Sequence, residues 1–125
     1  MEKIWLSEAR ELLKAAMETK GPDFVYNSSG IGTCSYKPII ELGAIDDPRR
    51  TTGCLIGVAM KLHGGLESLL TYKGNIAELN KDHNILTEDA CEYWGIAQMI
   101  QDTGGTWGYA YNAAENWLRN THNGN

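Results

Sequence analysis

The 125-residue sequence has little of what marks secreted or membrane-spanning proteins. It contains only 3 cysteines, 3 prolines and 1 phenylalanine. No apolar run approaches the ~20 residues that a membrane-spanning helix needs. The first residues lead straight into a charged helical pattern, without the apolar stretch of a signal peptide. We therefore expect no membrane partner, and we expect the protein to be located in the cytoplasm.

Basic residues are also scarce, because 11 lysines and arginines stand against 16 aspartates and glutamates, for a net charge of −5. A protein that binds nucleic acid nonspecifically needs a basic surface to displace counterions from phosphates, so we do not expect a nucleic-acid partner. Apolar residues, in contrast, make up 42% of the chain. That content suffices for one core, whereas two cores in so short a chain would each be too small. The sequence predicts one acidic domain.

The hydrophobic periodicity predicts a mainly α fold, α+β by strict class, with four to five helices and one short β-hairpin in a compact single domain. We expect the domain to cover residues 1–118 and residues 119–125 to form a flexible tail. Helices are expected up to residue 20 and over residues 52–62, 66–72, 87–103 and 106–118, and hairpin strands over residues 23–26 and 33–36. The segment 52–62 is apolar nearly all round, so it should be the most buried helix.

The cysteines Cys34, Cys54 and Cys91 are widely and irregularly spaced, with no Cys-x-x-Cys pair. No common zinc site, redox pair or other metal motif is therefore present, and we expect free, mostly buried thiols, no metal and no cofactor. Cys54 falls in the first turn of the central helix, where the dipole favours a thiolate, but its apolar neighbours favour a protonated, unreactive thiol. His63 lies nine residues on, on the opposite helix face, and cannot serve as its base. We expect no catalytic residue.

The start of the central helix is the one candidate ligand site. Two guanidinium groups and two hydroxyls stand where the free N–H groups of a helix favour an anion. These residues are Arg49, Arg50, Thr51, Thr52 and Gly53. The simpler interpretation, which we prefer, is that a threonine only caps the helix while the arginines pair with Asp46 and Asp47. A small anionic ligand remains the alternative.

The last helix is unusually rich in aromatic residues, which are common at the centres of protein interfaces. At helical spacing most aromatic residues belong to the core, but so many on one helix predict that some stay exposed. A partner protein or a second copy of the chain would then contact Trp107, Tyr109, Tyr111 and Trp117.

Three short patterns occur in order along the chain: Cys-x-Tyr at 34–36, Gly-Cys-Leu-Ile-Gly at 53–57, and Gln-Asp-x-Gly-x-Thr-Trp-Gly at 101–108. In this order they resemble a group of small uncharacterised proteins of actinobacteria and their phages. The resemblance covers about residues 23 to 114. It implies no activity and no catalytic residue. It does imply a phage or mobile-element accessory protein in the cytoplasm of a bacterial or phage-infected cell.

Two functions follow as expectations. The first is a small non-catalytic interaction protein that binds a host protein or associates with itself. The alternative is a small-ligand or nucleotide-phosphate binder, or a hydrolase, that uses the segment 49–53. The lack of any catalytic constellation favours the first.

Overall fold

The structure, a computed structural model, describes residues 3–26, 54–72 and 74–122. Within these ranges the chain forms five α-helices and one short 3-10 helix, and no strand. The helices are α1 (Leu6–Lys20), α2 (Leu55–His63), α3 (Ile76–His83), α4 (Glu88–Asp102) and α5 (Trp107–His122), with the 3-10 turn η2 at Glu67–Leu69. The mainly helical fold is thus confirmed for the described residues. The β-hairpin is not shown, because residues 24–26 lie in no strand and residues 27–36 are outside the described ranges.

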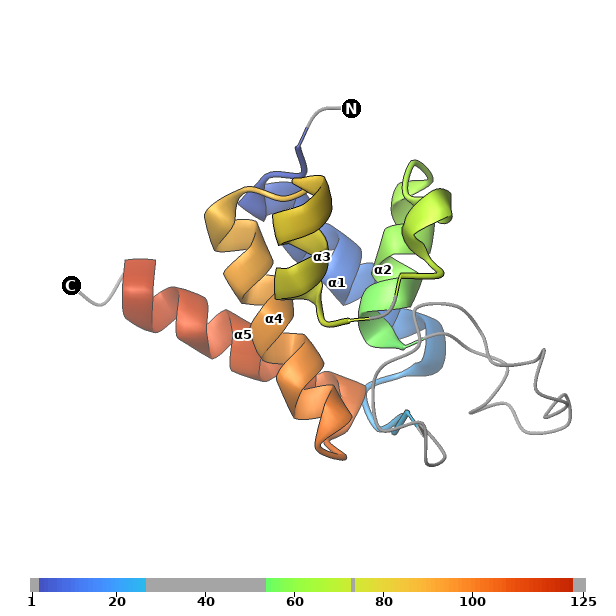
Figure 1. The fold of residues 1–125 in the computed structure, drawn as a ribbon. Coiled ribbons are helices and arrows are strands. Elements are labelled where there is room, and N and C mark those ends of the chain that lie inside the picture. Colours follow the sequence, from blue (N-terminus) through green and yellow to red (C-terminus); the bar gives the residue numbers. More distant parts are fainter. Residues whose placement is uncertain (1–2, 27–53, 73, 123–125) are drawn as a thin grey trace, which may run out of the picture.

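Helix α4 is the centre of the fold, since each of the other four helices packs against it. Figure 1 shows α4 in the middle of the arrangement, with α5 on one side and α2 on the other. Its sequence suits this place, because the large side chains of Tyr93 and Trp94 are fully buried. The indole N–H of Trp94 donates to the carbonyl of Ala9 on α1 at 3.0 Å, so even this buried polar atom is paired.

Two buried glutamines on α4 hold the ends of other helices. Gln98 and Gln101 are 2% and 1% exposed. The side-chain oxygen Oε1 of Gln98 accepts from the N–H of Ile76, the first residue of α3, at 2.7 Å. The side-chain oxygen Oε1 of Gln101 accepts from the N–H of Leu55, the first residue of α2, at 2.8 Å. Because the first N–H groups of a helix have no partner within it, each glutamine supplies an acceptor that would otherwise be missing.

The corner between α4 and α5 is shaped by the pattern that the sequence shows at residues 101–108. Gly104 follows α4 with φ +98, a conformation that side chains disfavour. Thr106 then caps α5, because its hydroxyl accepts from the N–H of Tyr109 at 3.1 Å. Trp107 is fully buried with its ring 4.7 Å from that of Phe24, and no described residue accepts from its indole N–H.

The segment that follows α1 supplies hydrogen-bond acceptors for the first N–H groups of α5. The N–H groups of Trp107 and Gly108 donate to the carbonyls of Phe24 and Pro22, both at 2.8 Å. This approach is so close that a Cβ on Gly108 would lie 2.6–3.0 Å from Pro22. The glycine in the Thr-Trp-Gly pattern is therefore required by backbone packing.

The N-terminal segment is anchored by a second backbone contact. Ile4 forms an isolated parallel bridge with Leu86, in which its N–H donates to Ile85 at 2.8 Å and its carbonyl accepts from Thr87 at 3.1 Å. Ile4 itself is fully buried. The chain before α1 is thereby tied to the loop that precedes α4.

The expected helices differ from the observed ones at several points. Helix α1 begins after Trp5, whose side chain is 67% exposed. Burial of the central helix is confirmed for residues 54–57, 59 and 60, whereas Val58 is partly buried and Leu62 is 47% exposed. Helix α5 runs to His122, four residues beyond the expected end of the domain at Leu118.

Helix α3 was not expected at all, although the sequence carries a signal for it. The side chain of Asn75 accepts from the N–H of Glu78 at 2.8 Å, and the carboxylate of Glu78 accepts from the N–H of Asn75 at 2.9 Å. This reciprocal capping box has the spacing that marks a helix start. The preceding Lys-Gly-Asn sequence had indicated only a break.

Adding a methyl group at two glycines tests the corner. Gly108→Ala should reduce the free energy of unfolding by about 1–3 kcal/mol, the usual range for overpacking, because its Cβ would contact the backbone of Pro22. Gly95→Ala on α4 is the matched control, since its Cβ would meet only Ile76 at 3.8 Å. It should leave stability unchanged or raise it by up to about 1 kcal/mol through helix propensity. Urea denaturation measures the free energy of unfolding of both variants. An equal loss of stability in the two variants would contradict the close approach of Gly108 to Pro22.

Candidate functional site

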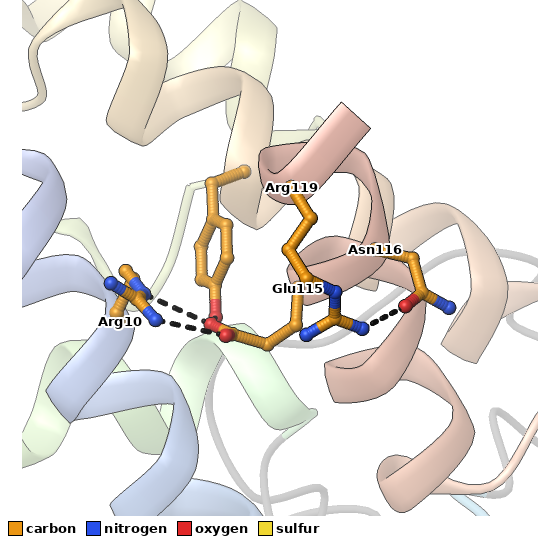
Figure 2. Close-up of polar contacts among 5 residues, drawn as sticks. Arg10, Glu115, Asn116 and Arg119 are labelled. Atoms are coloured by element: carbon orange, nitrogen blue, oxygen red, sulfur yellow. Dashed lines mark hydrogen bonds and ion pairs between the residues drawn. The ribbon is translucent and has the colours of Figure 1, made fainter. Parts of the chain in front are cut away.

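A cluster of charged and polar side chains joins three helices (Figure 2). The guanidinium group of Arg10, on α1, donates two hydrogen bonds to the carboxylate of Glu115, on α5, at 3.0 and 2.9 Å. The hydroxyl of Tyr93, on α4, donates to the same carboxylate. On the next turn of α5, Arg119 donates to Asn116.

The electrostatics of this cluster fix its protonation states. The hydrogen bonds from Arg10 and then from Tyr93 lower the pKa of Glu115 against the opposing effect of burial. Burial, and then the hydrogen bond to Glu115, raises the pKa of Tyr93. The carboxylate therefore stays ionised and the phenol protonated at neutral pH, so neither is suited to exchange protons there. The cluster is a clamp on α1, α4 and α5.

A pocket of about 350 Å³ lies beside the start of α4. Its lining combines three acidic residues with parts of α5: Glu88, Asp89, Glu92, Trp117 and Thr121. Acidic residues in a first turn stabilise a helix through its dipole. Asp89 in addition accepts hydrogen bonds from the hydroxyl of Thr87 and from the N–H of Ala90, at 2.7 and 2.8 Å. Glu88 and Asp89 thus have a structural role.

A second pocket, of about 370 Å³, lies between the start of α3 and the C-terminal half of α4. We call it the α3–α4 groove. Its lining is formed by Asn75, Ile76, Ala77, Gly95, Gln98, Met99, Asp102 and Thr103. Met99 is 58% exposed, and partial burial raises the pKa of Asp102. The one hydrogen bond that the side chain of Asp102 makes among the described residues comes from Gln101, at 2.7 Å.

The cysteines differ from the expectation. Cys54 is fully buried, as expected, but it is disulfide-bonded, and it occupies the N-cap position of α2 with an extended backbone. The expectation of a free thiol there is therefore wrong, because a sequence that shows only spacing cannot reveal which sulfurs meet in space. Cys91 is free and half-buried, and burial raises the pKa of its thiol. Neither sulfur has the character of an activated nucleophile.

The structure describes only some of the residues that the sequence singled out. The candidate anion site Arg49–Gly53 lies outside the described residues. Of the four aromatic candidates on α5, Trp107 is buried in the core, Tyr111 and Trp117 are partly buried, and Tyr109 is 61% exposed. Among the described residues no group of three histidine, cysteine or acidic side chains could hold a metal ion. No helix in the same ranges is long and apolar enough to cross a membrane.

The sequence analysis did not predict two features of the molecular surface. The Arg10–Glu115 pair joins residues 105 positions apart, and no local pattern predicts such a contact. The exposure of Met99 was also missed, although it falls outside the buried stripe of Ala90, Tyr93, Trp94 and Ala97. Helical periodicity of that stripe was the signal that could have placed Met99 on the outer face.

The states of Cys54 and Cys91 can be measured directly. Alkylation of the unfolded chain without a reductant should label Cys91 and not Cys54, because Cys91 is free and Cys54 is disulfide-bonded. The same reaction after reduction should label both residues. Mass spectrometry of the digested chain gives both results. A label on Cys54 without reductant would show that its thiol is free, as the sequence alone suggested.

The clamp predicts a pH dependence. The pKa of Glu115 in the folded chain is below its ordinary value of 4.5, so the ionised form adds stability above that value and loses it as the pH falls through the lower, folded value. Because the side chain of Arg10 is 46% exposed, solvent screening limits the contribution of the Arg10–Glu115 ion pair to the free energy of unfolding to about 1 kcal/mol.

The coupling between Arg10→Gln and Glu115→Gln, measured by urea denaturation in a double-mutant cycle, should be largest near pH 7 and vanish in strong acid. A coupling that is independent of pH would contradict an ionic clamp.

Comparison of the chain with protein-family models, with curated proteins and with solved structures gives no match.

Proposed function

We propose that this chain is a non-catalytic interaction protein that binds another protein or a second copy of itself. The observation that carries the proposal is the exposure of two large side chains, Met99 at 58% and Tyr109 at 61%. They belong to the last turn of α4 and the first turn of α5, on either side of the same corner. Methionine and tyrosine are enriched at interfaces, where they supply contact area.

The rigidity of the corner supports this role. The first four N–H groups of α5 all have acceptors, from Phe24, Pro22 and Thr106. A surface that is already ordered loses little conformational entropy on binding, so its contact area contributes more to affinity. The polar clusters, in contrast, are engaged in holding helices together and offer no reactive group.

The kind of partner and its location are further parts of the proposal. The resemblance to proteins of actinobacteria and their phages supports a host protein as the partner of a phage or mobile-element accessory factor. The cytoplasm is the location that this role implies. Because thiols in the cytosol of most organisms are kept reduced, this location requires that the fully buried disulfide at Cys54 resists reduction.

A pair of matched variants tests the proposal. Tyr109→Ser should weaken binding to the partner, or self-association in light scattering, by about tenfold or more, as loss of an interface anchor does. It should change the free energy of unfolding by less than about 1 kcal/mol, because the side chain is mostly exposed. Leu62→Ser is the control, since Leu62 is also exposed but lies at the far end of α2.

Thermal denaturation with nucleotides or inorganic phosphate separates this proposal from the alternative at Arg49–Gly53. We expect no stabilisation. A ligand at 100 times its Kd would add about 2.7 kcal/mol. If such a shift were measured, and the chain were strictly monomeric and retained no partner, the proposal of an interaction protein would be wrong and a phosphate-binding function would take its place.

A further inference from the structure

The α3–α4 groove is a hollow with an apolar floor. Ile76 and Ala77 line it from α3, and Gly95 and Met99 from α4. Gly95 leaves the hollow open, because a Cβ at this position would meet only Ile76, at 3.8 Å. Met99 borders the hollow with a flexible side chain that is more than half exposed, of the kind that adapts to different apolar partners.

The polar groups of the groove disfavour an anionic ligand. The N–H of Ile76, which would attract an anion at the start of α3, is taken by Gln98 at 2.7 Å. The N–H of Glu78 is taken by Asn75 at 2.8 Å. The carboxyl group of Asp102, which also lines the groove, would repel an anion at short range.

The same groups favour a cation. Among the described residues that line the groove none is basic, and the whole chain carries a net charge of −5. Asp102 is exposed at the border of the groove, and its hydrogen bond from the neutral side chain of Gln101 leaves its charge uncompensated within the lining that the structure describes. An incoming ammonium or guanidinium group would compensate that charge through a charge-assisted hydrogen bond.

We propose that the α3–α4 groove binds an exposed peptide segment of a partner protein, with an apolar side chain in the hollow beside Gly95 and a neighbouring lysine or arginine paired with Asp102. This inference rests on the proposed function and names the chemistry of the partner. Met99 lies both at the corner between α4 and α5 and in the lining of the groove, so the two parts of the proposed interface are continuous.

Nuclear magnetic resonance of the whole, isotope-labelled chain tests the groove with blocked dipeptides as probes. Acetyl-Leu-Lys-amide, at up to about 10 mM for an expected millimolar Kd, should shift the backbone amides of Ala77, Gly95 and Thr103. Acetyl-Leu-Glu-amide and acetyl-Gly-Lys-amide should each bind several-fold more weakly, because one lacks the cation and the other the apolar side chain. Absence of shifts with the first peptide, or equal binding of all three, overturns the proposal.

Three variants assign the binding to these residues. Gly95→Leu should fill the hollow and abolish the shifts, whereas Asp102→Asn should reduce the preference for Lys over Glu to about one. Glu92→Gln, on an outward face of α4, is the control and should leave binding unchanged. If Gly95→Leu does not fold, Ala77→Leu closes the groove from the exposed first turn of α3.

The outcome is separable from that of the proposed function. If the peptides fail to bind while association still depends on Tyr109, the groove is wrong and the interaction protein stands. If binding to the peptides is retained in Gly95→Leu, the probes bind elsewhere and the groove is equally excluded.

Discussion

Gln98 and Gln101 lie three residues apart on the buried side of α4, and each holds the first N–H of another helix. A buried N–H without an acceptor costs about 1–3 kcal/mol, so the starts of α2 and α3 depend on α4 being in place. Each hydrogen bond, at 2.8 Å or less, fixes the first residue of α2 or α3 opposite one particular side chain of α4. The central helix thereby determines where two others begin.

The remaining polar contacts have the same character. Trp94 joins α4 to α1 through the carbonyl of Ala9, and Tyr93 joins α4 to α5 through Glu115. Among the described residues, these polar side chains bind other parts of the fold. The same part of the chain also exposes large apolar side chains, such as Met99 and Tyr109, and the carboxyl group of Asp102.

Sequence patterns predicted the elements better than their contacts. The stripe of Ala9, Leu13 and Ala16 gave α1, Thr87 gave the start of α4, and Thr106 gave the start of α5, because periodicity and capping are local. The capping box of α3 was just as local and was overlooked. The partners of Gln98, Gln101 and Glu115 could not be predicted, since they depend on how distant helices meet.

The candidate site was harder still. The aromatic content of the last helix predicted that some of its aromatic residues, Tyr109 among them, stay exposed. Trp107, two residues earlier, is also a large aromatic residue, but it is fully buried. The difference arises from Phe24, which packs on the indole ring from a segment that sequence reasoning assigned to a hairpin. Only tertiary packing decides which of two neighbouring aromatic residues a partner can contact.

The two glutamine contacts also tie the protection of particular amide hydrogens to the docking of one helix. The N–H groups of Leu55 and Ile76 are each the first of their helix, a position where hydrogens usually exchange quickly with solvent. Here each is bonded to a buried side chain of α4, so the exchange of Leu55 reports separation of α2 from α4, and the exchange of Ile76 reports separation of α3 from α4. Equal exchange rates at the two positions would mean that both helices separate from α4 in one opening event.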